Sequence, residues 1–185
     1  MHGVGEDSFI RVPSFQSLWR LLVAAAVVAG LTIDTHPSAA GPADHSIYIK
    51  EAAMRFCVPE MWIEAVMRRE SAGNHKSTSP KGAMSLMQIM PETWAGLRRR
   101  HALGSNPYHP RDNILAGAAY MRELYNQFGA PNFLAAYNLG PERLARDLRA
   151  KRPLPSETRH YLRKLLPVVQ ENPPPPCIED AEEDD

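Results

Sequence analysis

The segment from Pro59 to Ser71 repeats apolar residues with the period of an amphipathic α-helix. At about 100° per residue, the apolar side chains from Trp62 to Met67 share one stripe, which has to be buried against other parts of the chain. Glu70 lies near the centre of that stripe and in the last turn of the helix. Lost hydration and the helix dipole both disfavour a carboxylate there, so we expect a raised pKa for Glu70. The pattern predicts either a general acid or a Glu whose head reaches solvent.

Helical signals continue along the chain, and no segment has the pattern of a convincing strand. The further predicted helices cover residues 46–56, 91–101, 112–128, 131–137, 142–150 and 156–170. Asp112 and Ser156 are the expected N-caps of the two longest ones. A loop rich in Ser, Gly, Asn and Pro follows the Glu70 helix. We therefore predict an all-α domain over residues 41–170.

The N-terminal residues 1–40 have the organisation of an export signal. Arg11 and Arg20 precede an apolar run of eleven residues, which is followed by the small residues Ser38-Ala39-Ala40. Eleven residues are too few to cross a bilayer, so we expect cleavage after Ala40, export of the mature chain and no stable membrane span. The alternatives are an uncleaved anchor and a true start other than Met1.

Charge is divided unevenly along the chain. Residues 41–170 carry 19 Lys and Arg against 11 Asp and Glu, a net charge of +8, whereas residues 171–185 carry seven acids and no base. The Pro-rich acidic tail, residues 171–185, is predicted to be disordered. The basic body suits a polyanionic partner such as nucleic acid, an anionic membrane or a cell-wall polymer, and equally suits a solvated surface with counterions.

Two cysteines follow the predicted signal, and their state is open. In an oxidising compartment Cys57 and Cys177 could pair, but Cys57 in an apolar stretch equally fits a small buried hydrophobe. No His/Cys cluster has the spacing of metal ligands, so neither a metal nor a cofactor is expected.

The residues around and after Glu70 form a more specific pattern. The chain contains Glu70-Ser71-Ala72-Gly73-Asn74, Ser79 to Pro91 with the run Leu86-Met87-Gln88-Ile89-Met90, Asn113 to Gly117, Ala135-Ala136-Tyr137-Asn138-Leu139-Gly140-Pro141, and Pro155 to Tyr161. This order and spacing resembles the catalytic domain of soluble lytic transglycosylases, which is related in fold to goose-type lysozymes. The resemblance covers about residues 46–166, and it implies a lysozyme-like helical domain.

The resemblance also implies a reaction. Enzymes of this family cleave the β-1,4 bond between N-acetylmuramic acid and N-acetylglucosamine in peptidoglycan without water, and form 1,6-anhydro ends. One acid, matching Glu70, serves first as proton donor and then as base. A hydrolytic lysozyme needs a second positioned carboxylate. Between Glu70 and Asp112 the only other acid is Glu92, so lysozyme-type hydrolysis is the less favoured alternative.

Two tyrosines and a serine are assigned by the same resemblance. Tyr137 is expected to donate a hydrogen bond to Glu70 and hold its carboxyl group, although a core tyrosine is the simpler alternative. Ser79 corresponds to a serine near the acid and the muramyl sugar. Tyr161 matches a tyrosine on the far wall of the cleft.

Three further residues are expected to bind substrate. Gln88 and Asn138 carry amides that can both donate and accept hydrogen bonds from sugar N-acetyl and hydroxyl groups. Met90 is expected to give an apolar contact to a sugar face, and without the resemblance it would be assigned to the core.

The chain departs from the family pattern at three positions. Ser85 stands where the family usually has glycine, and it would reshape the cleft if that position needs a positive φ. His75 replaces a common proline, and Leu139 replaces a small residue. None of these changes removes a group that transfers protons.

Other functional classes fit the sequence less well. A non-catalytic peptidoglycan-binding scaffold would not need Glu70, and a nucleic-acid binder would need a helix-turn-helix or interleaved basic and aromatic residues, which the sequence lacks. A small single domain also resembles transglycosylases that open the wall locally for secretion or conjugation machinery. We therefore expect peptidoglycan strands as substrate and such an envelope complex as a candidate partner, with a general role in turnover of the bacterial wall as an equal alternative.

Overall fold

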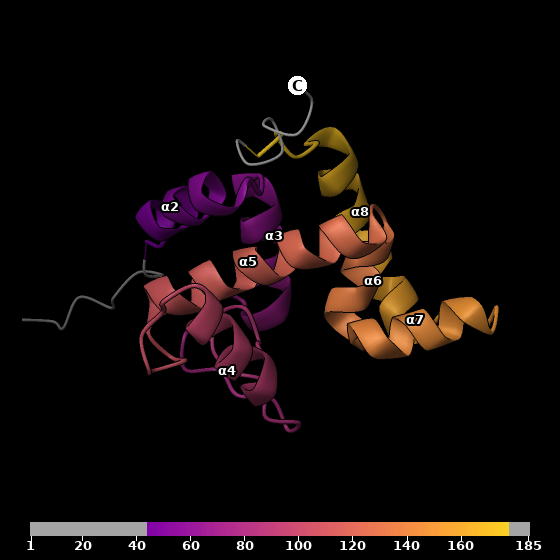
Figure 1. Ribbon diagram of the computed structural model, residues 1–185, viewed down its shortest axis with the longest axis horizontal. Coiled ribbons are helices and arrows are strands. Elements are labelled where there is room, and N and C mark those ends of the chain that lie inside the picture. The colour runs from indigo at the N-terminus through magenta and orange to yellow at the C-terminus, as the bar shows by residue number, and fades with distance from the viewer. Residues whose placement is uncertain (1–43, 178–185) are drawn as a thin grey trace, which may run out of the picture. The chain divides into compact units, whose positions relative to one another are not determined.

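Seven α-helices make up the domain in a computed structural model, which describes residues 44–177 (Figure 1). They are α2 (Ser46–Phe56), α3 (Glu60–Ser71), α4 (Pro91–Arg100), α5 (Pro110–Phe128), α6 (Asn132–Leu139), α7 (Pro141–Arg149) and α8 (Ser156–Glu171). In this part of the chain, β-structure is limited to the isolated bridges Thr78–Met84 and Met84–Ile89. The predicted all-α class is confirmed; the predicted signal, residues 1–40, lies outside the described residues.

Two helices for which polar N-caps were predicted have a proline at or next to their first residue. α5 starts at Pro110 and so places Asp112 inside its first turn, and α8 follows Pro155, which occupies the N-cap position instead of Ser156. Proline suits the first turn because its missing N–H would have no partner there. Both predicted N-caps are therefore wrong by one to three residues.

The core is centred on α5, which packs against α2, α3, α4 and α6 and crosses the middle of Figure 1. Its small residues permit close approach: a Cβ added to Gly117 would lie 2.6 Å from side-chain atoms of Met87. Trp62 of α3 stacks on Phe133 of α6, with ring centroids 4.8 Å apart. The apolar stripe of α3 is thus covered, as the sequence pattern requires.

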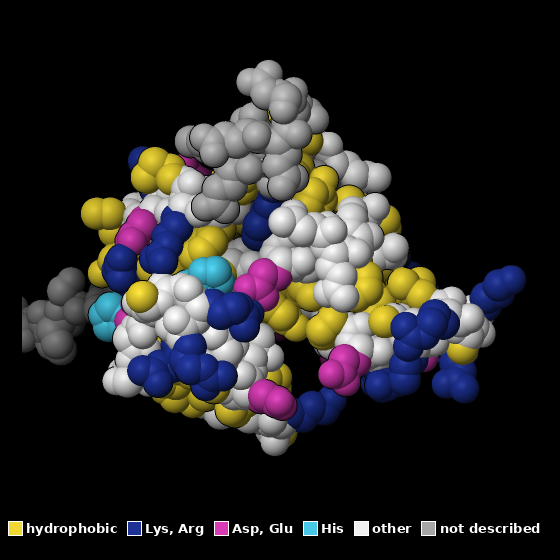
Figure 2. Space-filling view, in the orientation of Figure 1, with side chains coloured by type: hydrophobic (Ala, Val, Ile, Leu, Met, Phe, Trp, Pro, Cys, Tyr) yellow, Lys and Arg dark blue, Asp and Glu magenta, His cyan; other side chains and the backbone are white. Residues whose placement is uncertain are grey.

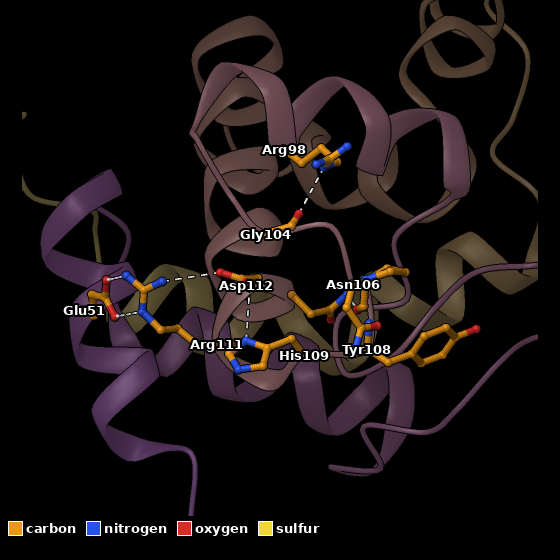
Figure 3. A network of polar contacts seen from close by, with 10 residues as sticks. Glu51, Arg98, Gly104, Asn106, Tyr108, His109, Arg111 and Asp112 are labelled. Carbon is orange, nitrogen blue, oxygen red and sulfur yellow. Dashed lines mark hydrogen bonds and ion pairs between the residues drawn. The ribbon is translucent and has the colours of Figure 1, made fainter.

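A polar network joins α2 to the start of α5 (Figure 3). Arg111 binds the carboxylate of Glu51 through two nitrogen atoms, and its third nitrogen lies 3.4 Å from Asp112. Asp112 also lies 3.2 Å from the Nδ1 atom of His109, while Arg98 donates a hydrogen bond to the carbonyl oxygen of Gly104. Asp112 therefore contacts the side chains of His109 and Arg111 instead of capping the helix.

The C-terminal segment is attached to the domain by a disulfide. Cys57, at the end of α2, is bonded to Cys177, and their Cα atoms lie 5.5 Å apart. The disulfide tethers the predicted tail to the domain at Cys177, and the predicted disorder of the tail stays a prediction. The remaining acidic residues, 178–185, lie outside the described part of the chain.

Surface charge follows the basic composition of the body. Lys and Arg side chains lie over α4 and gather at the outer end of α7 (Figure 2). Among the helices that the structure describes, none is long and apolar enough to cross a membrane.

Candidate active site

Glu70 lies in the last turn of α3, which ends where Ala72 adopts a left-handed conformation. Its side chain is mostly buried, and this desolvation raises the pKa of Glu70 above its usual value near 4.5. The hydrogen bond from Tyr161 and the charge of Arg69 act in the opposite direction, whereas the charge of Glu157 raises the pKa of Glu70 further. The net result is an acid that holds its proton closer to neutral pH, as predicted from the stripe on α3.

Tyr161, not Tyr137, holds the carboxyl group of Glu70. The Tyr161 hydroxyl donates a 2.8 Å hydrogen bond to Oε1 of Glu70, and the residue is only 2% exposed. The Tyr137 hydroxyl instead donates to the carbonyl oxygen of Met87 at 2.8 Å. The predicted hydrogen bond from Tyr137 to Glu70 is therefore wrong, although Glu70 is close enough to contribute, after burial, to the raised pKa of Tyr137.

Glu157 is an exposed acid whose charge raises the pKa of Glu70, and no role was predicted for it. It lies in the first turn of α8, one helical turn before Tyr161, and its charge acts on Glu70. A search for a second acid close to Glu70 in the sequence finds only Glu92. Glu157 lies almost ninety residues after Glu70, and the fold brings its charge near. The i,i+4 spacing to Tyr161 was the available signal, because it places both residues on one face of α8.

Ser79 and Asn113 fix the loop that follows α3. The Oγ atom of Ser79 accepts a hydrogen bond from the N–H of Ala83 at 3.0 Å. The buried side chain of Asn113 accepts from the N–H of Met87 at 2.8 Å and donates to the carbonyl oxygens of Met84 and Pro107. Asn113 belongs to the sequence pattern, but its role as an anchor of this loop was not predicted.

Gln88 and Asn138 are half-buried, whereas the side chain of Met90 is exposed. The amide nitrogen of Gln88 donates to the carbonyl oxygens of Ser85 at 2.7 Å and Ser77 at 3.3 Å, which leaves its oxygen able to accept from a ligand. The Oδ1 atom of Asn138 accepts a 2.9 Å hydrogen bond from Thr158. Met90 is 43% exposed, as an apolar contact to a ligand requires and as a core residue would not be.

Ser85 occupies a left-handed backbone conformation. Its φ is +64°, its N–H donates to the carbonyl oxygen of Ser77 at 2.7 Å, and its side chain is completely buried. Among the described residues its Oγ atom has no hydrogen-bond partner. The position therefore does have the positive φ that favours glycine, and serine carries both backbone strain and an unpaired hydroxyl there.

Replacing Ser85 by glycine is expected to stabilise the domain. Removing the left-handed strain and the unpaired hydroxyl gains about 1–2 kcal/mol, after the larger chain entropy of glycine in the unfolded state is subtracted. Urea unfolding of Ser85→Gly should show a higher midpoint with an unchanged slope. Ser77→Gly changes a nearby loop position that has no positive φ, so it should not stabilise the domain; a gain there equal to that of Ser85→Gly would contradict the explanation.

Tyr161→Phe is expected to lower activity and to move its pH dependence. The hydroxyl of Tyr161 stabilises the ionised form of Glu70, so its loss raises the pKa of Glu70. The limb of the pH–rate profile on which Glu70 loses its proton therefore moves to higher pH. We expect activity at neutral pH to fall by about one to two orders of magnitude. In Tyr137→Phe, whose hydroxyl bonds Met87, the limb should stay in place. Equal shifts in both variants would contradict the assignment.

Residues 44–177 contain no cluster of side chains with the arrangement of metal ligands. No group of three His, Cys, Asp or Glu residues is arranged there to hold an ion.

Known proteins resemble this chain in both sequence and fold. A family model described as the transglycosylase SLT domain matches residues 47–159. Soluble lytic murein transglycosylase of Escherichia coli K12 is 34% identical over 138 residues, which cover 71% of this chain and 21% of that protein. The transglycosylase of Enterobacteria phage PRD1 is 38% identical over 94 residues, which cover 50% of this chain and 33% of that protein.

The fold agrees with these sequence matches. An inactive mutant of lytic transglycosylase Slt from Pseudomonas aeruginosa superposes with a TM-score of 0.60 at 30% identity, over 71% of this chain and 25% of that one. The predicted lysozyme-like helical fold is therefore confirmed. The chain spans about a fifth of the length of the E. coli relative.

Proposed function

Because this chain belongs to the transglycosylase SLT domain family, we propose that it is a peptidoglycan lytic transglycosylase with Glu70 as its acid and base. The observation that carries the proposal is the buried carboxyl group of Glu70, with a raised pKa and a tyrosine hydroxyl directed at it. The substrate is the β-1,4 bond between N-acetylmuramic acid and N-acetylglucosamine, and the products end in 1,6-anhydro-muramic acid.

In the proposed reaction Glu70 first donates one proton to the substrate and then takes one proton back. Protonated Glu70 gives its proton to the leaving O4 of N-acetylglucosamine as the C1–O4 bond breaks. The carboxylate so formed takes the proton of the C6 hydroxyl, and O6 closes onto C1 of the muramic sugar. Glu70 returns to its protonated state and no water is consumed. Tyr161 stabilises the carboxylate between the two steps.

The surrounding side chains bind the glycan in this proposal. The amide oxygen of Gln88 accepts from sugar N–H or O–H groups, Asn138 hydrogen-bonds the sugars, and Met90 covers an apolar sugar face. Ser79 braces the loop beside the muramyl sugar, and Tyr137 fixes the carbonyl group of Met87 in the same loop.

Hydrolysis of the same bond is the second candidate, and one observation favours it. Glu157 supplies a second carboxylate whose charge reaches Glu70, and an inverting hydrolase uses such a group to activate water. Glu157 is exposed on the first turn of α8, so bulk water solvates its carboxylate. We therefore favour the transglycosylase reaction over hydrolysis.

Mass spectrometry of sacculi digested by the purified protein decides between the two reactions. Muropeptides with 1,6-anhydro-muramic ends would support the transglycosylase. Reducing ends would overturn it in favour of hydrolysis through Glu157. Sacculi that bind the protein but stay intact would make it a non-catalytic binding module.

We propose that the domain is exported to the periplasm and opens the cell wall locally for the assembly of envelope machinery. The basic surface of the domain and the acidic residues 178–185 offer contacts to such a complex. A chain that stops after Cys177 keeps the disulfide, so it should retain activity on sacculi but lose assembly of the machinery in cells. Full assembly with the shortened chain would remove this role for the tail.

A further inference from the structure

One helix of the domain is mostly exposed. α7 has a single buried residue, Leu144, and packs mainly against α6. Its outer end extends away from the other helices in Figure 1, and the consecutive residues 148–153 are all exposed. Because a helix this short is not stable alone, Leu144 and α6 hold it in place. The other sides of α7 are available to contact another molecule.

The exposed side of α7 is cationic. Arg143, Arg146 and Arg149 recur at every third residue and lie at least about 100° around the helix from Leu144. Two more cations follow directly, and Figure 2 shows Lys and Arg side chains gathered at this end. Residues 141–152 contain five Lys and Arg against two acids, a net charge of +3. We name the exposed residues at this end the basic tip: Arg146, Leu148, Arg149, Lys151 and Arg152.

The domain compensates little of this charge. Asp147 lies 3.9 Å from a nitrogen atom of Arg143 and 4.0 Å from one of Arg152, whose side chains are 55% and 73% exposed. Ion pairs of this length between exposed side chains contribute little. In the part of the chain that the structure describes, Arg146 and Arg149 form no ion pair. The basic tip therefore attracts an anionic partner.

Leu148 adds an apolar group to the basic tip. Its side chain is 46% exposed, and it stands between Arg146 and Arg149 in the sequence. Cations around exposed apolar residues are typical of helices that lie at a membrane surface. The cations there bind anionic headgroups, and the apolar side chain reaches the boundary of the acyl chains.

The size of the basic tip favours a membrane over a folded protein. A stable protein interface uses about 20–30 residues on each partner, far more than this tip offers. An anionic membrane needs no such area, because each cation near its surface strengthens binding about fivefold. We infer that the basic tip binds the anionic phospholipid surface of a membrane. This inference goes beyond the proposed function, since it requires neither Glu70 nor cleavage of a glycan.

Co-sedimentation with phosphatidylglycerol vesicles tests the inference, with phosphatidylcholine vesicles as the control of zero net charge. The test variant is Arg146→Gln/Arg149→Gln, which removes two exposed cations of the basic tip. The matched control is Arg99→Gln/Arg163→Gln, which removes the same charge from exposed positions on α4 and α8. We expect the test variant to bind phosphatidylglycerol about 25-fold more weakly, and the control variant at most about twofold more weakly. All of these side chains are exposed, so the urea midpoints of both variants should match that of the unmodified protein.

A second variant separates the apolar contact from the charges. Leu148→Ser keeps every cation and should weaken binding to phosphatidylglycerol about fivefold. Raising the salt concentration should weaken binding of the unmodified protein, because salt screens the charges. An unchanged affinity in Leu148→Ser would overturn the insertion of this side chain into the membrane surface.

Three other outcomes would overturn the inference. Equal binding to both lipids, or equal losses in the test and control variants, would mean that the charges of the basic tip do not decide binding. Binding only by a chain that ends at Cys177 would mean that residues 178–185 occupy the tip in the intact protein. No binding to either kind of vesicle would leave the tip to an acidic segment of a protein.

Discussion

Glu70→Gln is expected to lower cleavage of peptidoglycan by at least about 10³-fold, because one carboxyl group both donates and accepts the proton. Glutamine keeps the size of the side chain and can still accept the hydrogen bond from Tyr161. The loss should therefore appear in kcat, with little change in the binding of glycan strands. Quantified release of muropeptides from sacculi measures it.

The pH dependence of stability is the control for this variant. The folded-state pKa of Glu70 is raised above its usual value near 4.5, so the native state binds more protons than the unfolded state between those two pKa values. The stability of the unmodified protein therefore falls as pH rises through that window. Glutamine does not titrate, so Glu70→Gln should gain stability relative to the unmodified protein as pH rises from about 4.5 through the raised pKa of Glu70.

Two outcomes would contradict the role of Glu70. Near-normal turnover by Glu70→Gln would require another acid, and Glu157→Gln would then be the next variant to measure. A variant that is inactive but also less stable at neutral pH would place Glu70 in the framework of the fold instead of the reaction.

Cys177→Ser is expected to cost about 2–5 kcal/mol of the free energy of unfolding. The disulfide joins residues 120 apart in sequence, so it constrains nearly the whole domain in the unfolded chain. Cys177 lies after the last helix, and its loss leaves the core packing untouched. Urea unfolding under oxidising conditions measures the change in stability.

Reduction of the unmodified protein is the matched control. Dithiothreitol should lower its unfolding midpoint to that of Cys177→Ser and should have no further effect on that variant. Cys57→Ser should lose at least as much stability, since Cys57 also forms the C-cap of α2. Equal midpoints for oxidised protein, reduced protein and Cys177→Ser would mean that the bond does not stabilise the domain.

Helical periodicity alone identifies most of the architecture. The stripe on α3, the small residues of α5 and the breaks at proline and glycine each follow from contacts within one helix or from local backbone preferences. The helix ends are less well defined by sequence: Asp112 has the residue type of a cap, but Pro110 extends α5 by two residues and turns Asp112 into an ion-pair partner of Arg111. A cap and an ion pair use the same residue types, so sequence cannot separate them.

The partner of Glu70 shows a different limit. Tyr137 and Tyr161 are both aromatic residues in the sequence pattern, and either hydroxyl could reach a carboxylate. The choice depends on how α6 and α8 pack beside α3, which places Tyr161 on Glu70 and Tyr137 on the carbonyl group of Met87. The same packing brings Glu157 into the electrostatic field of Glu70.

The sequence by itself determined the helical class, the burial of an acid on α3 and the glycine-like position of Ser85, because each is written in local periodicity or in a short motif. Only the tertiary structure decided which tyrosine holds that acid and whether Cys57 and Cys177 pair. Those features join residues about ninety or more positions apart. Their distance is set by the packing of whole helices, and no local pattern carries that information.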